Sequence, residues 1–126
     1  MTPFGKEIRK LRIDADITMS DMAKGLGKLP SYLSAVELGD KPLSDEFAKA
    51  IIGYLQTLPY FRKHRLDTEY LLRVADRTRR TVDVHALQDR DRETVAAFAR
   101  RLPGLSAQKR ATVNKKLEEW LSDKEE

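Results

Sequence analysis

Cysteine and histidine, two residue types that often carry catalysis or bind metals, are scarce in this 126-residue chain, which has no cysteine and two histidines, His64 and His85. His64 and Asp67 are close enough in sequence to share a metal ion, but no third ligand stands at a usual spacing from them. The glycine stretch at residues 25–27 lacks the strand, the lysine and the third glycine of a phosphate-binding loop. We therefore expect no enzymatic activity, no cofactor and no metal site.

Residues 17–39 have the spacing of two short helices joined by a tight turn. Thr18 is a suitable N-cap for a helix over residues 19–26. Gly27 fits the left-handed position that ends a helix, and residues 30–38 then repeat apolar side chains at helical spacing. Two crossed helices joined by a glycine turn form a helix-turn-helix, whose second helix can lie in the major groove of DNA.

Residues 4–57 resemble the Xre/Cro–repressor helix-turn-helix family of phage and bacterial regulators. The pattern runs without gaps from Phe4 to Gly39: Ile-Arg-Lys-Leu-Arg, then Ile-Thr, then Met-Ala-x-x-Leu-Gly, and then Tyr-Leu-Ser-x-Val-Glu-x-Gly. We therefore expect an all-α fold with a five-helix, repressor-like DNA-binding domain in residues 1–78. A short extended segment and a C-terminal helical hairpin should follow in residues 79–126.

The resemblance also implies which side chains face the bases of DNA. The matching positions are Ser31, Tyr32, Ser34 and Ala35. A serine hydroxyl pairs with several bases, and Tyr32 and Ala35 suit a thymine methyl group. None of the four is a residue such as Gln, Arg or Asn, which could form two hydrogen bonds to one base. Tyr32 suits the hydrophobic core equally well, and both interpretations remain open.

Contacts to the phosphates of DNA are expected from four residues. Lys28 lies in the turn and Lys41 follows the second helix, although each lysine also fits an ordinary solvated surface charge. Thr18 and Met19 begin the first helix of the motif, where the family often has a phosphate-binding Gln. A thioether cannot donate a hydrogen bond, so only backbone N–H groups remain there.

Two charged residues match a structural ion pair of the family. An arginine near the end of the family's first helix pairs with the glutamate that closes the recognition helix, and Arg12 and Glu37 are the matching residues here. The alternative is that both are solvated surface charges.

The segment that follows the expected domain contains two ambiguous patterns. Residues 81–86 alternate apolar and polar side chains like a strand, which either pairs with its copy across a two-fold axis or is an extended linker. Arg73, Arg77 and Arg80 recur at helical spacing, either as a ridge that contacts phosphates or as a solvated helix face.

The expected C-terminal hairpin is too small to bury its own apolar side chains. It must therefore pack on the first domain or on a second subunit, and a two-fold dimer is the more informative interpretation because regulators of this class typically read two half-sites. The side chains of the expected dimer or partner surface are Val95, Phe98, Leu102, Val113, Leu117, Trp120 and Leu121.

Charge and hydropathy narrow the range of functions. Residues 1–58 carry eight basic and eight acidic side chains, so the net charge of +4 comes entirely from residues 59–126. DNA contacts must therefore come from the local placement of Lys and Arg. No apolar run approaches the roughly 18 residues of a membrane span, and the N-terminus lacks the apolar stretch of a signal peptide. We expect a cytoplasmic, nucleoid-associated protein with no membrane partner.

These observations together predict a transcriptional regulator. The hypothesis is a repressor that binds a two-fold operator in double-stranded DNA as a homodimer, with residues 30–38 in the major groove. The alternative is a protein-interaction module with the same fold, such as an antitoxin-like protein whose partner is a toxin or a metallopeptidase.

Overall fold

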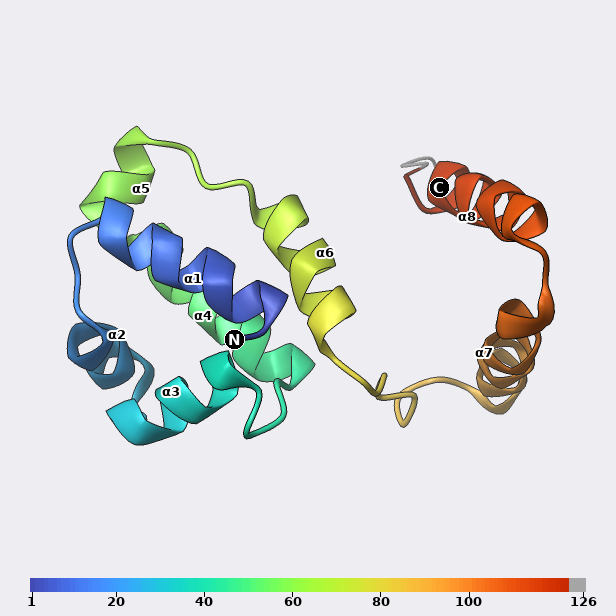
Figure 1. Cartoon of the computed structure of the whole chain (residues 1–126), viewed down its shortest axis with the longest axis horizontal. Coiled ribbons are helices and arrows are strands. Elements are labelled where there is room, and N and C mark those ends of the chain that lie inside the picture. The colour runs from blue at the N-terminus through green and yellow to red at the C-terminus, as the bar shows by residue number, and fades with distance from the viewer. Residues whose placement is uncertain (123–126) are drawn as a thin grey trace. The chain divides into compact units, whose positions relative to one another are not determined.

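The computed structural model describes residues 1–122, and the chain divides into two compact units, Met1–Val82 (unit 1) and Asp83–Glu126 (unit 2). Every regular element in the described part of the chain is a helix (Figure 1), which confirms the all-α prediction. None of these helices combines the length and the apolar character needed to cross a bilayer.

Unit 1 consists of six helices: α1 (Pro3–Asp14), α2 (Met19–Leu26), α3 (Pro30–Leu38), α4 (Asp45–Thr57), α5 (Pro59–Lys63) and α6 (Thr68–Thr78). The bounds of α2 and α3 are those predicted from the sequence. The five expected helices correspond to α1, α2, α3, α4 and α6. A sixth, short helix, α5, lies between α4 and α6 in sequence and begins at Pro59, because proline favours the first position of a helix.

Three of the four helix ends in the helix-turn-helix have a side-chain cap or a glycine in the left-handed region. The Thr18 hydroxyl accepts a hydrogen bond from the Asp21 N–H at 3.0 Å, and the Asp21 carboxylate accepts one from the Thr18 N–H at 3.2 Å. Gly27 and Gly39 end α2 and α3 in the left-handed region, with φ of 69° and 92°. The exception is the start of α3, where Leu29 occupies the N-cap position and offers no side-chain acceptor.

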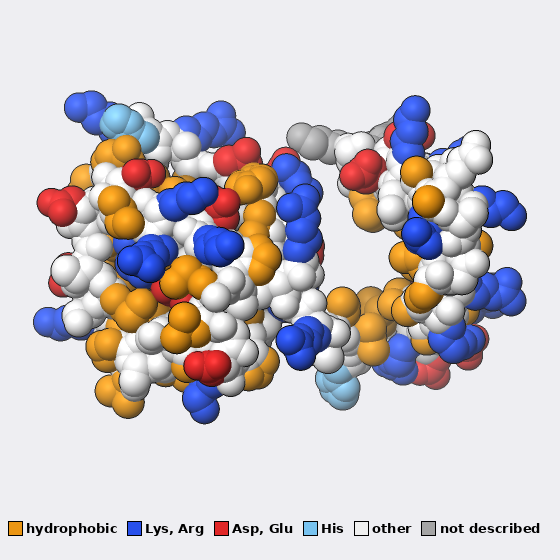
Figure 2. All heavy atoms as spheres, in the orientation of Figure 1, with side chains coloured by type: hydrophobic (Ala, Val, Ile, Leu, Met, Phe, Trp, Pro, Cys, Tyr) orange, Lys and Arg blue, Asp and Glu red, His pale blue; other side chains and the backbone are white. Residues whose placement is uncertain are grey.

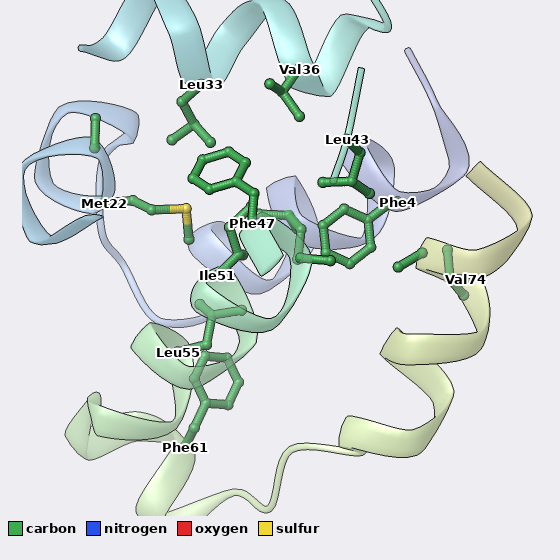
Figure 3. Close-up of a cluster of buried hydrophobic side chains, with 14 residues drawn as sticks. Phe4, Met22, Leu33, Val36, Leu43, Phe47, Ile51, Leu55, Phe61 and Val74 are labelled. Atoms are coloured by element: carbon green, nitrogen blue, oxygen red, sulfur yellow. The ribbon is translucent and has the colours of Figure 1, made fainter. Parts of the chain in front are cut away.

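The hydrophobic core of unit 1 packs the two helices of the helix-turn-helix, α2 and α3, against α1 and α4. α1 packs on α3 and α6, while α4 packs on α2, α5 and α6. In Figure 3, Met22, Leu33 and Phe47 point toward one another from α2, α3 and α4. The largest fully buried side chains come from four helices: Ile8, Met22, Leu33, Ile51 and Leu55.

The start of α1 lies directly against the end of α3. The N–H and the hydroxyl of Thr2 both donate to the Glu37 carbonyl oxygen, at 3.0 and 3.2 Å. A Cβ atom on Gly5 would lie 2.3 Å from that same oxygen. Only glycine permits this approach, so the position of α3 is fixed partly by the first turn of α1.

The three arginines predicted to share one helix face do not do so. α6 ends at Thr78, and Arg79 already has extended backbone angles. Arg73 and Arg77 therefore lie on the helix, whereas Arg80 lies beyond its end. The predicted ridge stops at Arg77.

Unit 2 contains α7 (Asp89–Arg101), the 3-10 turn η1 (Leu102–Gly104) and α8 (Ala107–Ser122). α7 and α8 diverge from the turn (Figure 1), and no residue of unit 2 within the described range is buried. Residues 81–86, which straddle the boundary between the units, form a loop and no strand within this chain. The Arg92 guanidinium donates to the carbonyl groups of Val84, His85 and Leu87.

Candidate nucleic-acid interface

α3 has one buried side and one open side. Three of its side chains point inward and are buried: Leu33, Val36 and Glu37. Ser31 is exposed on the other side, and Ser34 and Ala35 are half-buried. The open side thus carries two hydroxyl groups and a methyl group, followed at the end of the helix by the exposed Leu38. The small side chains leave room for a close approach by a partner surface at the start of the helix.

Tyr32 belongs partly to the core. Its ring packs against Phe47, with the ring centroids 5.5 Å apart and the planes tilted by 56°. The Lys28 ammonium lies above both rings, 5.6 Å from the Tyr32 centroid and 6.0 Å from the Phe47 centroid. This cation–π geometry orients Lys28 at the turn while leaving its charge exposed.

Arg12 and Glu37 are brought together as a bidentate ion pair inside unit 1. The Arg12 Nη1 donates to Glu37 Oε2, and Nη2 donates to Oε1 at 3.2 Å. Both side chains are buried, with no unsatisfied buried side-chain nitrogen or oxygen in the described residues. Removing either partner would leave an uncompensated buried charge, so this pair fixes α1 against α3.

The start of α2 offers few donors to a phosphate. The Thr18 oxygen already accepts the Asp21 N–H, and the Met22 N–H is bonded to the Thr18 carbonyl oxygen. Within the helix's first turn, the N–H groups of Met19 and Ser20 remain for an outside acceptor. The Asp21 carboxylate sits at the same helix end and opposes a second negative charge there.

The structure adds one residue, Arg9, that the sequence analysis did not assign to this site. Arg9, Met19 and Ser34 line a hollow of about 380 Å³ beside the Arg12–Glu37 pair. Arg9 precedes Arg12 by three positions, one helical turn, so its position on the same side of α1 was recognisable from the sequence.

The other predicted site residues fall into two groups. Lys41 is exposed in the loop between α3 and α4. All residues of the predicted dimer or partner surface belong to unit 2. Three of these are half-buried (Leu102, Val113 and Leu117), and four are exposed (Val95, Phe98, Trp120 and Leu121).

The histidines have no metal-binding surroundings in the described structure. The His64 ring stacks on Tyr60, with the ring centroids 4.3 Å apart. Residues 1–122 contain no group of three His, Cys, Asp or Glu side chains that could hold a metal ion.

Comparisons with known proteins bear on unit 1 alone. A family model described as "Helix-turn-helix" matches residues 8–61, from α1 through α4 into α5. No curated protein and no solved structure matches the chain significantly. The matched segment contains the capped α2, the Gly27 turn, α3 and the Arg12–Glu37 pair. Residues 8–61 are a helix-turn-helix domain of the Xre/Cro type, a family of DNA-binding regulators of transcription.

Proposed function

We propose that this protein is a sequence-specific transcriptional repressor that binds a two-fold DNA operator as a homodimer. The observation that carries the proposal is the asymmetry of α3. Its inner side is held by the core and by the Arg12–Glu37 pair, while Ser31, Ser34 and Ala35 face outward. A rigid helix with small side chains along most of its outer side suits the major groove, which is about 12 Å wide.

The charged contacts expected on DNA all go to the phosphate backbone, and the contacts to bases come from small, uncharged side chains. Ser31 and Ser34 supply hydroxyl groups to base edges, and Ala35 supplies a methyl group for a thymine. Lys28 and Lys41 supply charge to phosphates, and the N–H groups of Met19 and Ser20 supply neutral donors. Because no residue here reads a base bidentately, one copy alone should discriminate weakly between sequences.

Weak discrimination by one copy favours a dimer that reads two half-sites. Unit 2 supports this part of the proposal, because its apolar residues up to position 122 are half-buried or exposed, and Trp120 and Leu121 are 70% and 83% exposed. A second copy that packs against the same residues would bury them and place two recognition helices on one operator.

The test of DNA binding is a gel-shift titration of the protein on duplex DNA from its own upstream region. The titration is repeated at two salt concentrations and with a random duplex of equal length. The expected result is tighter binding to the upstream region, with Ser31→Ala/Ser34→Ala reducing that preference. Equal affinity for both duplexes would reject sequence-specific regulation.

The test of the dimer is the mass in solution, measured by light scattering after size exclusion. The wild-type protein should run as a dimer and Leu117→Asp as a monomer. Gln108→Glu, which adds a negative charge to an exposed position of the same helix, is the matched control and should remain dimeric. A monomeric wild-type protein would remove the homodimer from the proposal.

The exposed apolar side chains of unit 2 also support a second candidate function. A protein-interaction module, for example an antitoxin, would use them to cover a partner such as a toxin or a metallopeptidase. Equal affinity for both duplexes together with a monomeric wild-type protein would favour this candidate over the repressor.

A further inference from the structure

The positive charge of this protein is concentrated in a part of unit 1 outside the helix-turn-helix. Residues 59–82 hold seven basic and three acidic side chains, which accounts for the whole net charge of +4. Residues 1–58 hold eight of each kind, and residues 83–126 hold nine of each. Figure 2 shows Lys and Arg side chains over α1 and along α6. A polyanion seated on α3 would gain most from contacts that reach this region.

A hollow of about 320 Å³ connects the recognition helix to this basic region. It is lined by the end of α3, by the loop that follows it and by the segment after α6. The basic residues Lys41 and Arg80 both line it, although they lie 39 positions apart in sequence. Asp40 and Arg79 are the other charged residues of the lining.

Arg79 is held in place by two carboxylates. Its Nη1 donates to Asp45 at 3.0 Å and its Nη2 donates to Asp76 at 2.7 Å. The bond to Asp45 joins the end of α6 to the start of α4, and the two bonds together neutralise two acids that would otherwise oppose an anion. Within residues 1–122, Lys41 and Arg80 take part in no ion pair. Both are exposed and available to a ligand.

We infer that this hollow is a second DNA contact, in which Lys41 and Arg80 together bind backbone phosphate beside the recognition helix. The inference rests on the proposed function and extends its interface beyond the helix-turn-helix to the arginine that follows α6. Arg80 is a positioning contact with no role in reading bases, because a phosphate carries no sequence information. It would compensate for the poor donors at the start of α2.

Salt dependence gives this inference a distinctive signature. Each phosphate neutralised on duplex DNA contributes about 0.9 to the slope of log affinity against log salt concentration. Each substitution acts in both copies of the proposed dimer, so Arg80→Ala should flatten the slope by about 1.8, and Lys41→Ala/Arg80→Ala by about 3.6. The loss of affinity should be the same on the upstream duplex and on a random duplex, since both present the same backbone.

The experiment measures fluorescence anisotropy of both duplexes with the full-length protein at four salt concentrations. Arg80→Lys keeps the charge and should retain most of the slope. Arg62→Ala removes an exposed charge from α5, away from the hollow, and is the matched control. A thermal melt of each variant checks that unit 1 remains folded. A parallel titration with inorganic phosphate detects a site for free anions.

The possible outcomes separate this inference from the proposed function. If the wild-type protein prefers the upstream duplex and Arg80→Ala keeps the wild-type slope, the inference is overturned and the proposed function stands. If the wild-type protein binds neither duplex, both are overturned. If millimolar inorganic phosphate stabilises the wild-type protein but not Arg80→Ala, and the DNA slopes are unchanged, the hollow is a site for a free anion.

Discussion

Glu37 ties the recognition helix to α1 through both its side chain and its backbone. The carboxylate is paired with Arg12, and the carbonyl oxygen accepts two hydrogen bonds from Thr2. Substitutions at this position should therefore act first on the stability of the fold and only then on DNA binding.

Glu37→Ala should lower the free energy of unfolding by about 3–5 kcal/mol, because it leaves the Arg12 guanidinium buried and unpaired. Urea denaturation followed by circular dichroism measures the change. Asp40→Ala, three positions further on and exposed, is the control and should unfold like the wild-type protein. The double replacement Arg12→Met/Glu37→Leu should recover much of the loss, since it removes both charges together. An unchanged unfolding curve for Glu37→Ala would contradict the structural role of the pair.

Gly5→Ala should destabilise unit 1 although alanine is the better helix former. The new Cβ would meet the Glu37 backbone at 2.3 Å, and relieving that overlap should cost on the order of 1–3 kcal/mol. Gly53→Ala is the matched control in α4, where a Cβ meets nothing within 4 Å. That variant should gain up to about 1 kcal/mol from helix propensity. Opposite shifts of the melting temperature are the expected result.

Tyr70 should make the stability of unit 1 sensitive to alkaline pH. Its hydroxyl donates to the Glu7 carboxylate at 3.2 Å, and this bond, with the negative charge of Glu7, raises the pKa of Tyr70 above 10.0. The stabilisation is complete below the unfolded-state pKa and is lost as the pH rises through the folded-state value. Tyr70→Phe should therefore lose less stability than the wild-type protein between about pH 9 and about pH 11. Urea denaturation at several pH values tests this, and parallel curves for the two proteins would contradict it.

Residue-scale contacts divide into those that the sequence indicates and those that it does not. The family pattern pointed to Arg12 and Glu37 because both stand at fixed positions in local motifs. It did not indicate that Gly5 touches the Glu37 backbone or that Lys28 lies over the Tyr32 ring. Those contacts depend on how closely and at what angle helices cross, which a one-dimensional pattern does not contain.

At the scale of the helices, α2 and α3 differ in how well their N-termini are capped. Thr18 caps α2 through a reciprocal bond with Asp21, whereas α3 begins at Leu29 without any side-chain acceptor. Leu29 is also 71% exposed, so its side chain contributes little to the core. α3 should therefore be the helix whose stability is most easily improved.

Leu29→Ser should raise the stability of unit 1, and Thr18→Ala should lower it, each by about 1 kcal/mol. The serine oxygen can accept a backbone N–H of the first turn of α3, and the alanine at position 18 removes such an acceptor from α2. Leu29→Ala is the control that changes the side chain without adding an acceptor. Differential scanning calorimetry of the three variants measures the shifts. A melting temperature for Leu29→Ser no higher than that of Leu29→Ala would show that no cap forms.

The bounds of a helix were predictable where the residues that set them lie close to its ends in sequence. The bounds of α2 and α3 followed from Thr18, Gly27, Pro30 and Gly39, which act within one turn of the chain. The bounds of α6 also agree with the sequence, because Asp67 caps its start and the predicted end is near Thr78. Only the placement of Arg80 on its face was wrong, because arginines at helical spacing do not show where a helix stops. Arg79 leaves the helix as it reaches Asp45 of α4, a contact across 34 positions of sequence.

At the scale of the whole molecule, the two units differ in how they can be stable. Unit 1 buries side chains from all six of its helices, while no described residue of unit 2 is buried. Unit 1 should therefore fold without unit 2, and unit 2 should depend on something that covers its apolar side chains. The sequence already indicated this imbalance, because a helix pair of that size cannot enclose a core. It could not indicate what covers the pair.

A fragment of residues 1–82 should retain the melting temperature of the DNA-binding unit in the full-length protein. A fragment of residues 83–126 should be largely unfolded when dilute and gain helix content with concentration, because association would bury its apolar side chains. Circular dichroism over a hundredfold range of concentration tests both. A second fragment whose helix content does not depend on concentration would contradict the dependence on a covering surface.

The exposed position of Trp120 also provides an optical probe. It is the only tryptophan of the chain, and it lies in the unit that should associate, not in the unit with the closed core. Its emission should be that of an indole in water for the dissociated chain and shift to shorter wavelength on association. Tryptophan fluorescence would then report subunit exchange while remaining blind to the unfolding of residues 1–82. The two transitions of this protein can thus be followed separately in one sample without any added label.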